Sequence, residues 1–265
     1  MGEAWATQNK SLPAGCTLIL CGIFCDPGRT VLLSADCQVE LPELSCEKHE
    51  EADTRMFAHI AHSVQILHHK WAVVVATDTD VIMMCMYYIT HMDGLQEMWV
   101  KTMAIFLPVH AITEALVGKY DVAASDLTSL LLSTYILTGC DTVCYLYRRE
   151  KRLAYTTAIK ILTDLLLLCR YGDPEESLAA GGNLDALRPH LFVSLKGDMG
   201  CLPPIEDIFL LHLHQPLHQL ALCKRAHMVQ PTYPAATDYG RQLVNGKLVA
   251  TMMLKEAKPS ELKHS

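Results

Sequence analysis

The chain has 265 residues, of which 51% are hydrophobic, and a formal net charge of −7. This length and composition suffice for one substantial core, or for one core with an appendage. The acidic balance excludes a chain-wide attraction to nucleic acid, so such binding would need a local basic patch. No apolar run reaches the ~20 residues that a transmembrane helix needs. We therefore expect an intracellular protein, in the nucleus or cytoplasm, with no membrane partner.

The eleven cysteines do not have the pattern of a secreted disulfide framework, because their number is odd and no Cys-x₂-Cys pair occurs. Three residues separate Cys21 from Cys25, and three separate Cys140 from Cys144. Neither spacing is that of a zinc knuckle. We therefore interpret most cysteines as small buried apolar side chains.

Hydrophobic spacing and turn residues divide the first half of the chain into predicted elements. In chain order they are strands over 17–24 and 30–34, a helix over 51–68, a strand over 72–77, an apolar segment over 81–90 that fits a strand or a helix, and a strand over 98–106. The Asp26-Pro27-Gly28 turn favours a hairpin between the first two strands.

The second half is predicted to be mainly helical. Its elements are a short helix opened by Pro108, an apolar helix N-capped by Asp126 that runs through Leu137 and stops at Gly139, a helix over 149–169, a loop over 177–204, and a helical pattern over 205–229 that Pro216 should kink or break. Helices that alternate with apolar strands indicate an α/β fold with a mainly parallel sheet flanked by helices and a helical C-terminal appendage.

The most informative stretch is Asp78-Thr79-Asp80, which directly follows a valine-rich run. A β-branched run predicts a buried strand, and ligands bind at the carboxyl ends of such strands. Two carboxylates this close repel each other unless a cation or a shared proton relieves them, which favours a Mg²⁺ or Mn²⁺ site. An equally open interpretation is that Asp78 N-caps the next helix and that Asp80 lies in its first turn.

Two further acidic clusters lie at element boundaries. Glu51 and Asp53 begin an amphipathic helix, and Asp141 lies in the turn after the apolar helix. The helix dipole and an i,i+4 pair between Glu51 and Arg55 could account for the first cluster alone. Acid pairs from separate elements at one sheet edge can instead hold two metal ions, which bind a phosphodiester, activate a water and stabilise the leaving oxygen.

In this order and spacing, the acidic motifs resemble those of the PIN-like flap-endonuclease superfamily. The motifs that carry the resemblance are Glu51-Ala52-Asp53, Thr77-Asp78-Thr79-Asp80 after the valine-rich strand, and Gly139-Cys140-Asp141 after the hydrophobic helix. The strings HEEADTR, TDTDV and TGCDT are closer still to a branch of that superfamily found in transposon-derived animal genes. The stretches 202–207, 238–241 and 245–248 also resemble that branch, so the likeness covers most of the chain.

The resemblance implies a hydrolase that cuts phosphodiester bonds of DNA or RNA with Mg²⁺ or Mn²⁺. The implied catalytic metal ligands are Glu51, Asp53, Asp78, Asp80 and Asp141. After the third motif the superfamily has a segment that contacts nucleic acid, and here that position holds a basic cluster made of Arg148, Arg149, Lys151 and Arg152. These side chains could hold backbone phosphates, or they could simply be a solvated helix start.

The chain departs from the superfamily pattern at its beginning. The nuclease fold starts with a strand that ends in a metal-binding Asp, and the nearest substitute here is Asp26, whose Asp-Pro-Gly context indicates a turn. We therefore expect an N-terminally truncated or decayed copy. Its parts would be an incomplete PIN-like nuclease core over 1–200, a helical appendage over 201–230 and an irregular tail over 231–265.

Other functions fit part of the pattern. A haloacid-dehalogenase-like phosphatase would use Asp78 as nucleophile and Asp80 as acid, but would leave Glu51 and Asp53 without a role. A sugar transferase could use Asp-x-Asp to hold a metal–nucleotide. A catalytically inactive nuclease-fold module, kept for binding nucleic acid or protein, is favoured by the missing N-terminal acid.

Overall fold

The computed structural model describes residues 12–49, 51–140, 143, 151–160 and 206–250. These residues form a mixed α/β structure of small sheets and packed helices, which confirms the expected mixture of helices and strands. The predicted mainly parallel sheet is not found among them. Their central sheet has three strands, of which one pair is parallel and the other antiparallel.

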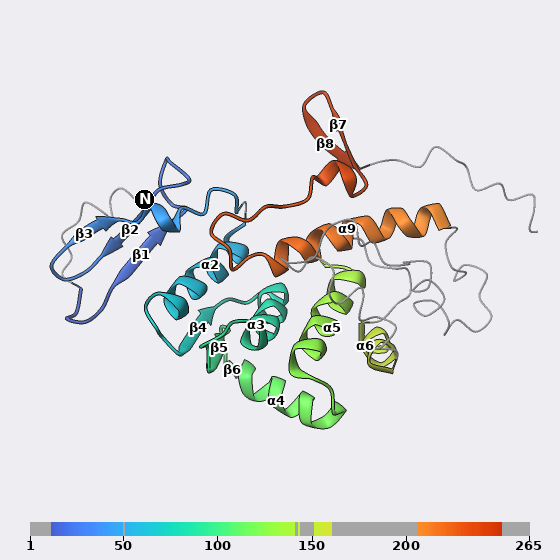
Figure 1. The fold of residues 1–265 in the computed structure, drawn as a ribbon, viewed down its shortest axis with the longest axis horizontal. Helices are drawn as coiled ribbons and strands as arrows, with labels where there is room; N and C mark the ends of the chain where they lie inside the picture. Colours follow the sequence, from blue (N-terminus) through green and yellow to red (C-terminus); the bar gives the residue numbers. More distant parts are fainter. Residues whose placement is uncertain (1–11, 50, 141–142, 144–150, 161–205, 251–265) are drawn as a thin grey trace, which may run out of the picture.

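An antiparallel sheet forms the N-terminal end of the described structure and projects beyond α2 (Ala52–Gln65) (Figure 1). Its strands are β1 (Leu18–Cys21), β2 (Thr30–Leu33) and β3 (Gln38–Glu40), followed by the short helix η1 (Pro42–Leu44). β1 and β2 pair antiparallel, so the predicted hairpin is confirmed. The sheet's own core is small, because only Phe24 and Val31 form its buried cluster.

The chain turns sharply at the end of β1, where it approaches α2. Gly22 has φ +73°, and a Cβ built on it would lie 2.0 Å from Nη1 of Arg55. That guanidinium is held in place, since its Nε donates to the backbone carbonyl of His49 at 2.8 Å. Glycine at position 22 therefore suits the left-handed backbone and leaves space for the guanidinium of Arg55.

We expect Gly22→Ala to lower the free energy of unfolding by about 2 kcal/mol, because it adds the displacement of Arg55 to the backbone strain. Gly15→Ala is the control: its φ is +81° but nothing lies near its Cβ. It should cost about 1 kcal/mol. Urea denaturation measures both, and equal losses would contradict this account of the contact.

The central sheet contains one parallel pair of strands and one antiparallel strand. Its strands are β4 (Trp71–Val75), β5 (Glu97–Lys101) and β6 (Phe106–Pro108). β4 and β5 are parallel, and β6 turns back antiparallel beside β5. The single strand predicted over 98–106 is therefore two strands joined by a tight turn, in which Thr102 and Ile105 exchange hydrogen bonds.

The prediction of a buried strand is wrong for β4. Val74 is 5% exposed, but Val73 on the opposite face is 57% exposed and its neighbours Trp71 and Val75 are more exposed still. The strand β4 lies at the edge of a three-stranded sheet, and only one face of this sheet packs on helices. Because successive side chains of a strand point to opposite faces, they alternate between buried and exposed. An apolar run alone does not distinguish this arrangement from burial on both faces.

Val74→Ala should lower the free energy of unfolding by about 2 kcal/mol, since it removes buried methyl groups from the core. The matched substitution Val73→Ala, one residue earlier on the exposed face, should cost less than about 0.5 kcal/mol. Thermal and urea unfolding of the two variants measure the difference. Similar losses at both positions would mean that both faces of β4 are covered.

Helices α3, α4 and α5 follow the strands and pack together. They are α3 (Thr79–His91), α4 (Val109–Tyr120) and α5 (Ala124–Leu137). The apolar segment that fitted either a strand or a helix is thus the helix α3. Pro108 opens α4, as predicted, and every residue from Leu127 to Leu137 is buried. The predicted N-cap is wrong: Ala123 is the N-cap of α5, and Asp126 lies in its first turn.

Two more helices complete the described fold: α6 (Lys151–Lys160) and α9 (Glu206–Lys224). The helix expected over 149–169 is seen as α6, while its part beyond 160 and the predicted loop over 177–204 lie outside the described residues. Pro216 does not break α9. The missing N–H costs one hydrogen bond, and the buried Leu213, Leu217 and Leu220 on one face hold the helix against the core.

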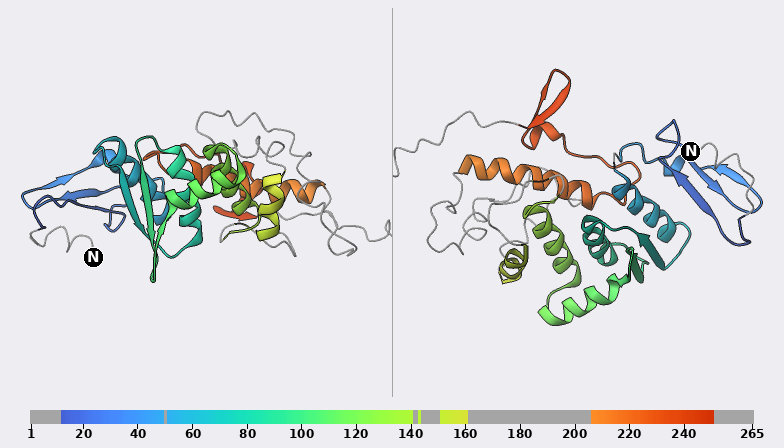
Figure 2. Two further views of the ribbon diagram at one scale, coloured as in Figure 1. Left: turned by 90° about the horizontal axis from the view of Figure 1, so that it is seen from below. Right: turned by 180° about the vertical axis from the view of Figure 1, so that it is seen from behind.

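The segment after 231 is not irregular throughout, contrary to expectation. A hairpin of β7 (Arg241–Val244) and β8 (Lys247–Ala250) follows the short helix η4 (Ala236–Asp238). Asn245 and Gly246 connect its strands with φ of 51° and 76°, which is the Asn-Gly signature of a two-residue hairpin turn. The views in Figure 2 place this hairpin at the periphery, beside α9.

The main core joins the central sheet to α2, α3, α5 and the carboxyl end of α9. At that end the Tyr88 hydroxyl of α3 donates to the carbonyl of Cys223 at 2.7 Å and accepts from the backbone N–H of His227 at 3.1 Å. The ring of Tyr88 stacks on Phe57 of α2 at 4.6 Å between centroids. No helix within the described ranges is long and apolar enough to cross a membrane.

Candidate functional site

The acids of the Asp78-Thr79-Asp80 motif begin α3 at the carboxyl end of β4. Asp78 is the N-cap: its Oδ1 accepts the backbone N–H of Asp80 at 3.0 Å, and its side chain is exposed. The capping interpretation is therefore confirmed for Asp78, and Asp80 lies in the first turn as expected. An N-cap hydrogen bond uses one carboxylate oxygen, so capping does not by itself exclude a metal at the other.

Asp80 has a partner that the sequence pattern did not indicate. The hydroxyl of Tyr135, near the end of α5, donates to Oδ1 of Asp80. Burial, together with this hydrogen bond and the charge of Asp80, raises the pKa of Tyr135 far above its ordinary value, so the phenol stays protonated. The hydrogen bond ties the start of α3 to the end of the helix that precedes the Gly139-Cys140-Asp141 turn.

The first acidic cluster lies at the start of α2. Glu51 is its N-cap, with an extended backbone and an exposed side chain, and Asp53 is half-buried in the first turn. The hydroxyl of Thr54 donates to the Glu51 carbonyl at 3.1 Å. Arg55, the expected i,i+4 partner of Glu51, directs its Nε to the carbonyl of His49.

The buried thiol of Cys223, near the carboxyl end of α9, is influenced electrostatically by residues of three other parts of the chain. Burial raises the pKa of this thiol, and the negative charges of Cys140, Asp80 and Glu51 add to the shift. Cys140 directly precedes Asp141, which itself lies outside the described residues. Geometrically, the hydrogen bond from Tyr135 places the second acidic cluster beside the end of α5, the helix that leads to Cys140.

The acidic side chains of the described residues do not form a compact group. Within the described ranges, no three carboxylates have oxygens that all lie within 4.8 Å of one another. Gly139, at φ +100°, follows α5, and Cys140 and Val143 form an isolated bridge. A closed set of three carboxylate ligands at this edge would need a member from outside the described ranges, such as Asp141.

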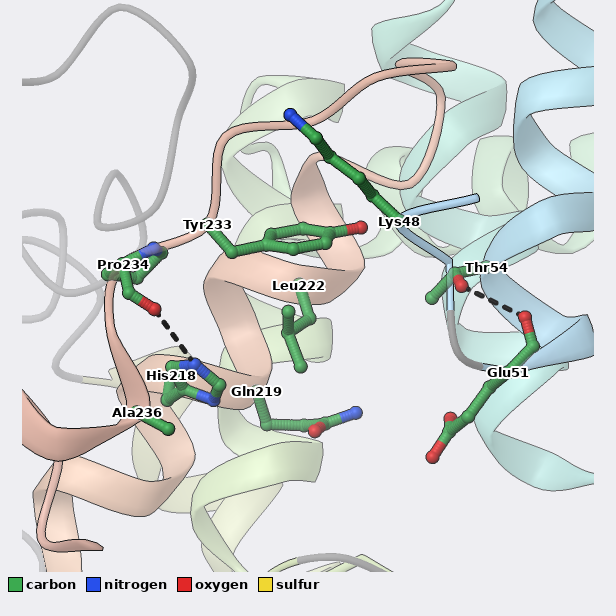
Figure 3. A pocket seen from close by; sticks show the side chains of 9 residues that line it. All are labelled: Lys48, Glu51, Thr54, His218, Gln219, Leu222, Tyr233, Pro234 and Ala236. Atoms are coloured by element: carbon green, nitrogen blue, oxygen red, sulfur yellow. Dashed lines mark hydrogen bonds between the residues drawn. The ribbon is translucent and has the colours of Figure 1, made fainter. Parts of the chain in front are cut away.

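A pocket of about 240 Å³ adjoins Glu51 (Figure 3). It is lined by Lys48, Glu51 and Thr54 at the start of α2, by His218, Gln219 and Leu222 of α9, and by Tyr233, Pro234 and Ala236. Nε2 of His218 is hydrogen-bonded to the carbonyl of Pro234 at 3.2 Å. Figure 3 shows the amide of Gln219 pointing toward the side of the pocket where Glu51 lies. The pocket therefore presents polar groups of both signs beside the first acidic cluster.

The basic cluster is seen only in part. Arg148 and Arg149 lie outside the described residues, while Lys151 begins α6 and Arg152 is exposed on it. Helix α6 packs against α5, the helix that leads to the Gly139-Cys140-Asp141 turn. The expectation that this cluster contacts phosphates stays a prediction.

A second group of candidate ligands was not predicted. Cys21, Cys46 and His59 each offer one ligand atom, and these atoms all lie within 4.8 Å of one another. A hydrogen bond between the thiols lowers the pKa of Cys21, and His59 acts in the same direction. The three residues come from distant parts of the sequence, so no local spacing could reveal them.

The interpretation of most cysteines as buried apolar side chains holds for only three of the eight in the described ranges. Cys46, Cys85 and Cys223 are buried, Cys21 and Cys140 are half-buried, and Cys16, Cys25 and Cys37 are exposed. The exposed ones lie in the N-terminal sheet region, whose small core leaves little room for buried side chains.

Comparison with known proteins gives no match: no protein-family model matches the chain, and no curated protein or solved structure is significantly similar to it. The function has to be inferred from the residues of this chain and from the resemblance of its acidic motifs.

The side chains of Tyr135 and Asp80 should be energetically coupled through their hydrogen bond. We expect Tyr135→Phe to lower the free energy of unfolding by about 2 kcal/mol, because the acceptor is charged. In an Asp80→Asn background the same change should cost distinctly less. A double-mutant cycle by urea denaturation measures the coupling, which should be about 1–3 kcal/mol. Additive effects of the two substitutions would contradict the contact.

Proposed function

We propose that this chain is a divalent-metal-dependent nuclease-like domain of PIN-like fold, with Mg²⁺ or Mn²⁺ bound at the edge where β4 ends. The observation that carries the proposal is the hydrogen bond from the hydroxyl of Tyr135 to Asp80, which joins the second acidic motif to the end of α5, the helix that leads to the third motif. The acidic motifs follow one another along the chain in the order that the nuclease superfamily uses, and this hydrogen bond supports a common location for the second and the third.

The proposed roles follow from the chemistry of the side chains. Carboxylate oxygens from Asp78, Asp80 and Asp141 would hold one ion, and Glu51 with Asp53 would hold or approach a second. Two such ions bind a phosphodiester, lower the pKa of a water and stabilise the leaving oxygen. No histidine base is required. The phenol of Tyr135 keeps Asp80 oriented, since it donates to one oxygen of that carboxylate.

Substrate binding would use charge of the opposite sign. Arg152 is exposed on α6, and Lys151, Arg148 and Arg149 precede it in the sequence. These basic side chains would contact backbone phosphates without reading bases. Binding of this kind weakens steeply as salt is raised, which gives a readout that does not depend on cleavage.

A second candidate function is a nuclease-fold module that binds nucleic acid or protein without cutting it. One specific observation favours it: Asp78 caps α3 and Asp80 accepts from Tyr135, and no three carboxylates of the described residues form a compact group. The two candidates differ only in whether metal completes the site.

The experiment is cleavage of labelled single-stranded and flap-containing DNA and RNA with Mn²⁺ or Mg²⁺. The nuclease proposal predicts metal-dependent cleavage that Asp80→Asn reduces by about 10²-fold or more, since it removes a metal ligand. Asp93→Ala is the matched control, because Asp93 is exposed just beyond the opposite end of α3. It should leave the rate unchanged.

The outcomes separate the candidates. Absence of cleavage together with salt-dependent nucleic-acid binding would favour the inactive module and contradict the nuclease. Turnover of a small phosphate ester that Asp78→Asn abolishes, without cleavage of nucleic acid, would favour a phosphatase instead. Equal activity of the Asp80→Asn and Asp93→Ala proteins would contradict a metal site at this edge.

A further inference from the structure

Three soft donor groups meet between the N-terminal sheet and α2. Cys21 is the last residue of β1, Cys46 lies in the loop after η1, and His59 lies in the middle of α2. Their ligand atoms all lie within 4.8 Å of one another. Cys46 is buried, and Cys21 and His59 are half-buried. Side chains from three elements thus point into one small volume.

The donor set selects the metal. We propose that Cys21, Cys46 and His59 bind one Zn²⁺ ion. Two thiolates and one imidazole suit zinc, whereas Mg²⁺ and Mn²⁺ prefer carboxylate oxygens. Zinc bonds of about 2.3 Å to sulfur and 2.0–2.1 Å to nitrogen set tetrahedral ligand atoms about 3.5 Å apart. Small side-chain adjustments therefore bring the three groups onto one ion, and each thiol releases its proton as the ion binds.

The local fold explains why a metal would be useful here. The sheet of β1, β2 and β3 has only Phe24 and Val31 in its buried cluster. A three-stranded sheet with so little apolar burial needs another source of stability, and a structural zinc supplies it in small domains. The ion would tie β1 and the Cys46 loop to α2. Thr30 already ties the sheet to η1, just before Cys46, since its hydroxyl donates to the carbonyl of Leu44 at 3.0 Å.

One coordination position would be left for a non-protein ligand. Cys21 and His59 also line a pocket of about 510 Å³ between β1 and α2, whose wall includes Arg55 and His62. A water from this pocket would complete the tetrahedron around the ion. The zinc site shares no residue with the acidic edge at β4. The zinc proposal can therefore be tested independently of the proposed nuclease function.

The test is metal binding by the full chain, made metal-free under reducing conditions and titrated with Zn²⁺ or Co²⁺. We expect one tightly bound ion per chain and, with Co²⁺, a thiolate charge-transfer band and tetrahedral visible absorption. Cys21→Ser, Cys46→Ser and His59→Gln should each weaken binding by more than about 100-fold. Cys25→Ser is the matched control, because Cys25 is exposed and lies close to Cys21 in sequence. It should bind as tightly as the unchanged chain.

The unchanged chain supplies a second readout in case a ligand variant does not fold. Its thermal midpoint should rise with Zn²⁺ and fall when a chelator removes the ion, because a ligand that binds the native state stabilises it. Failure of the unchanged chain to bind zinc stoichiometrically would overturn the proposal. Equal weakening by Cys25→Ser would do so as well.

Discussion

Helix α3 is buried over most of its surface, with Val81 and Cys85 fully buried and Tyr88 almost so. It packs on α5, on α4 and on the central sheet, and Tyr88 reaches the carboxyl end of α9. A helix that is apolar all round has to be surrounded, so the other elements are arranged about it. Because α3 starts directly after β4, the same burial fixes Asp78 and Asp80 at the carboxyl edge of the strand. The position of the acidic motif is thus a consequence of core packing.

The elements that the sequence predicted well are those with a local signal. The periodicity of apolar residues predicts α2. Pro108 indicates the start of α4, and Gly139 indicates the end of α5. The errors arose where tertiary context decides. The valine run looked like a strand buried on both faces, yet a small sheet leaves one face of β4 open. Pro216 looked like a helix breaker, yet burial of one side of α9 outweighs the lost hydrogen bond. The hairpin of β7 and β8 has a local signal in Asn245-Gly246, although this stretch is predicted to be an irregular tail.

The candidate site was predictable to the same extent. Motif order predicts that Glu51, Asp80 and Asp141 belong together. The described fold joins Asp80 to the end of α5 through Tyr135, while Asp141 lies outside the described residues. The sequence could not indicate Tyr135 as the partner of Asp80, because that contact depends on how α5 crosses α3. It also could not reveal the Cys21, Cys46 and His59 group, whose members approach only when the N-terminal sheet packs on α2. Both are long-range contacts between residues that carry no shared motif.

The two proposed metal sites would serve different purposes, one stabilising a small sheet and the other supplying hydrolytic chemistry.

The central claim is that the edge where β4 ends holds a catalytic divalent metal. The most direct measurement is anomalous diffraction from crystals of the full chain grown with Mn²⁺. The account predicts a manganese peak among the carboxylates of Asp78, Asp80 and Asp141, with Glu51 within reach of the ion or its waters. Ordered carboxylates with no manganese between them at millimolar Mn²⁺ would contradict it.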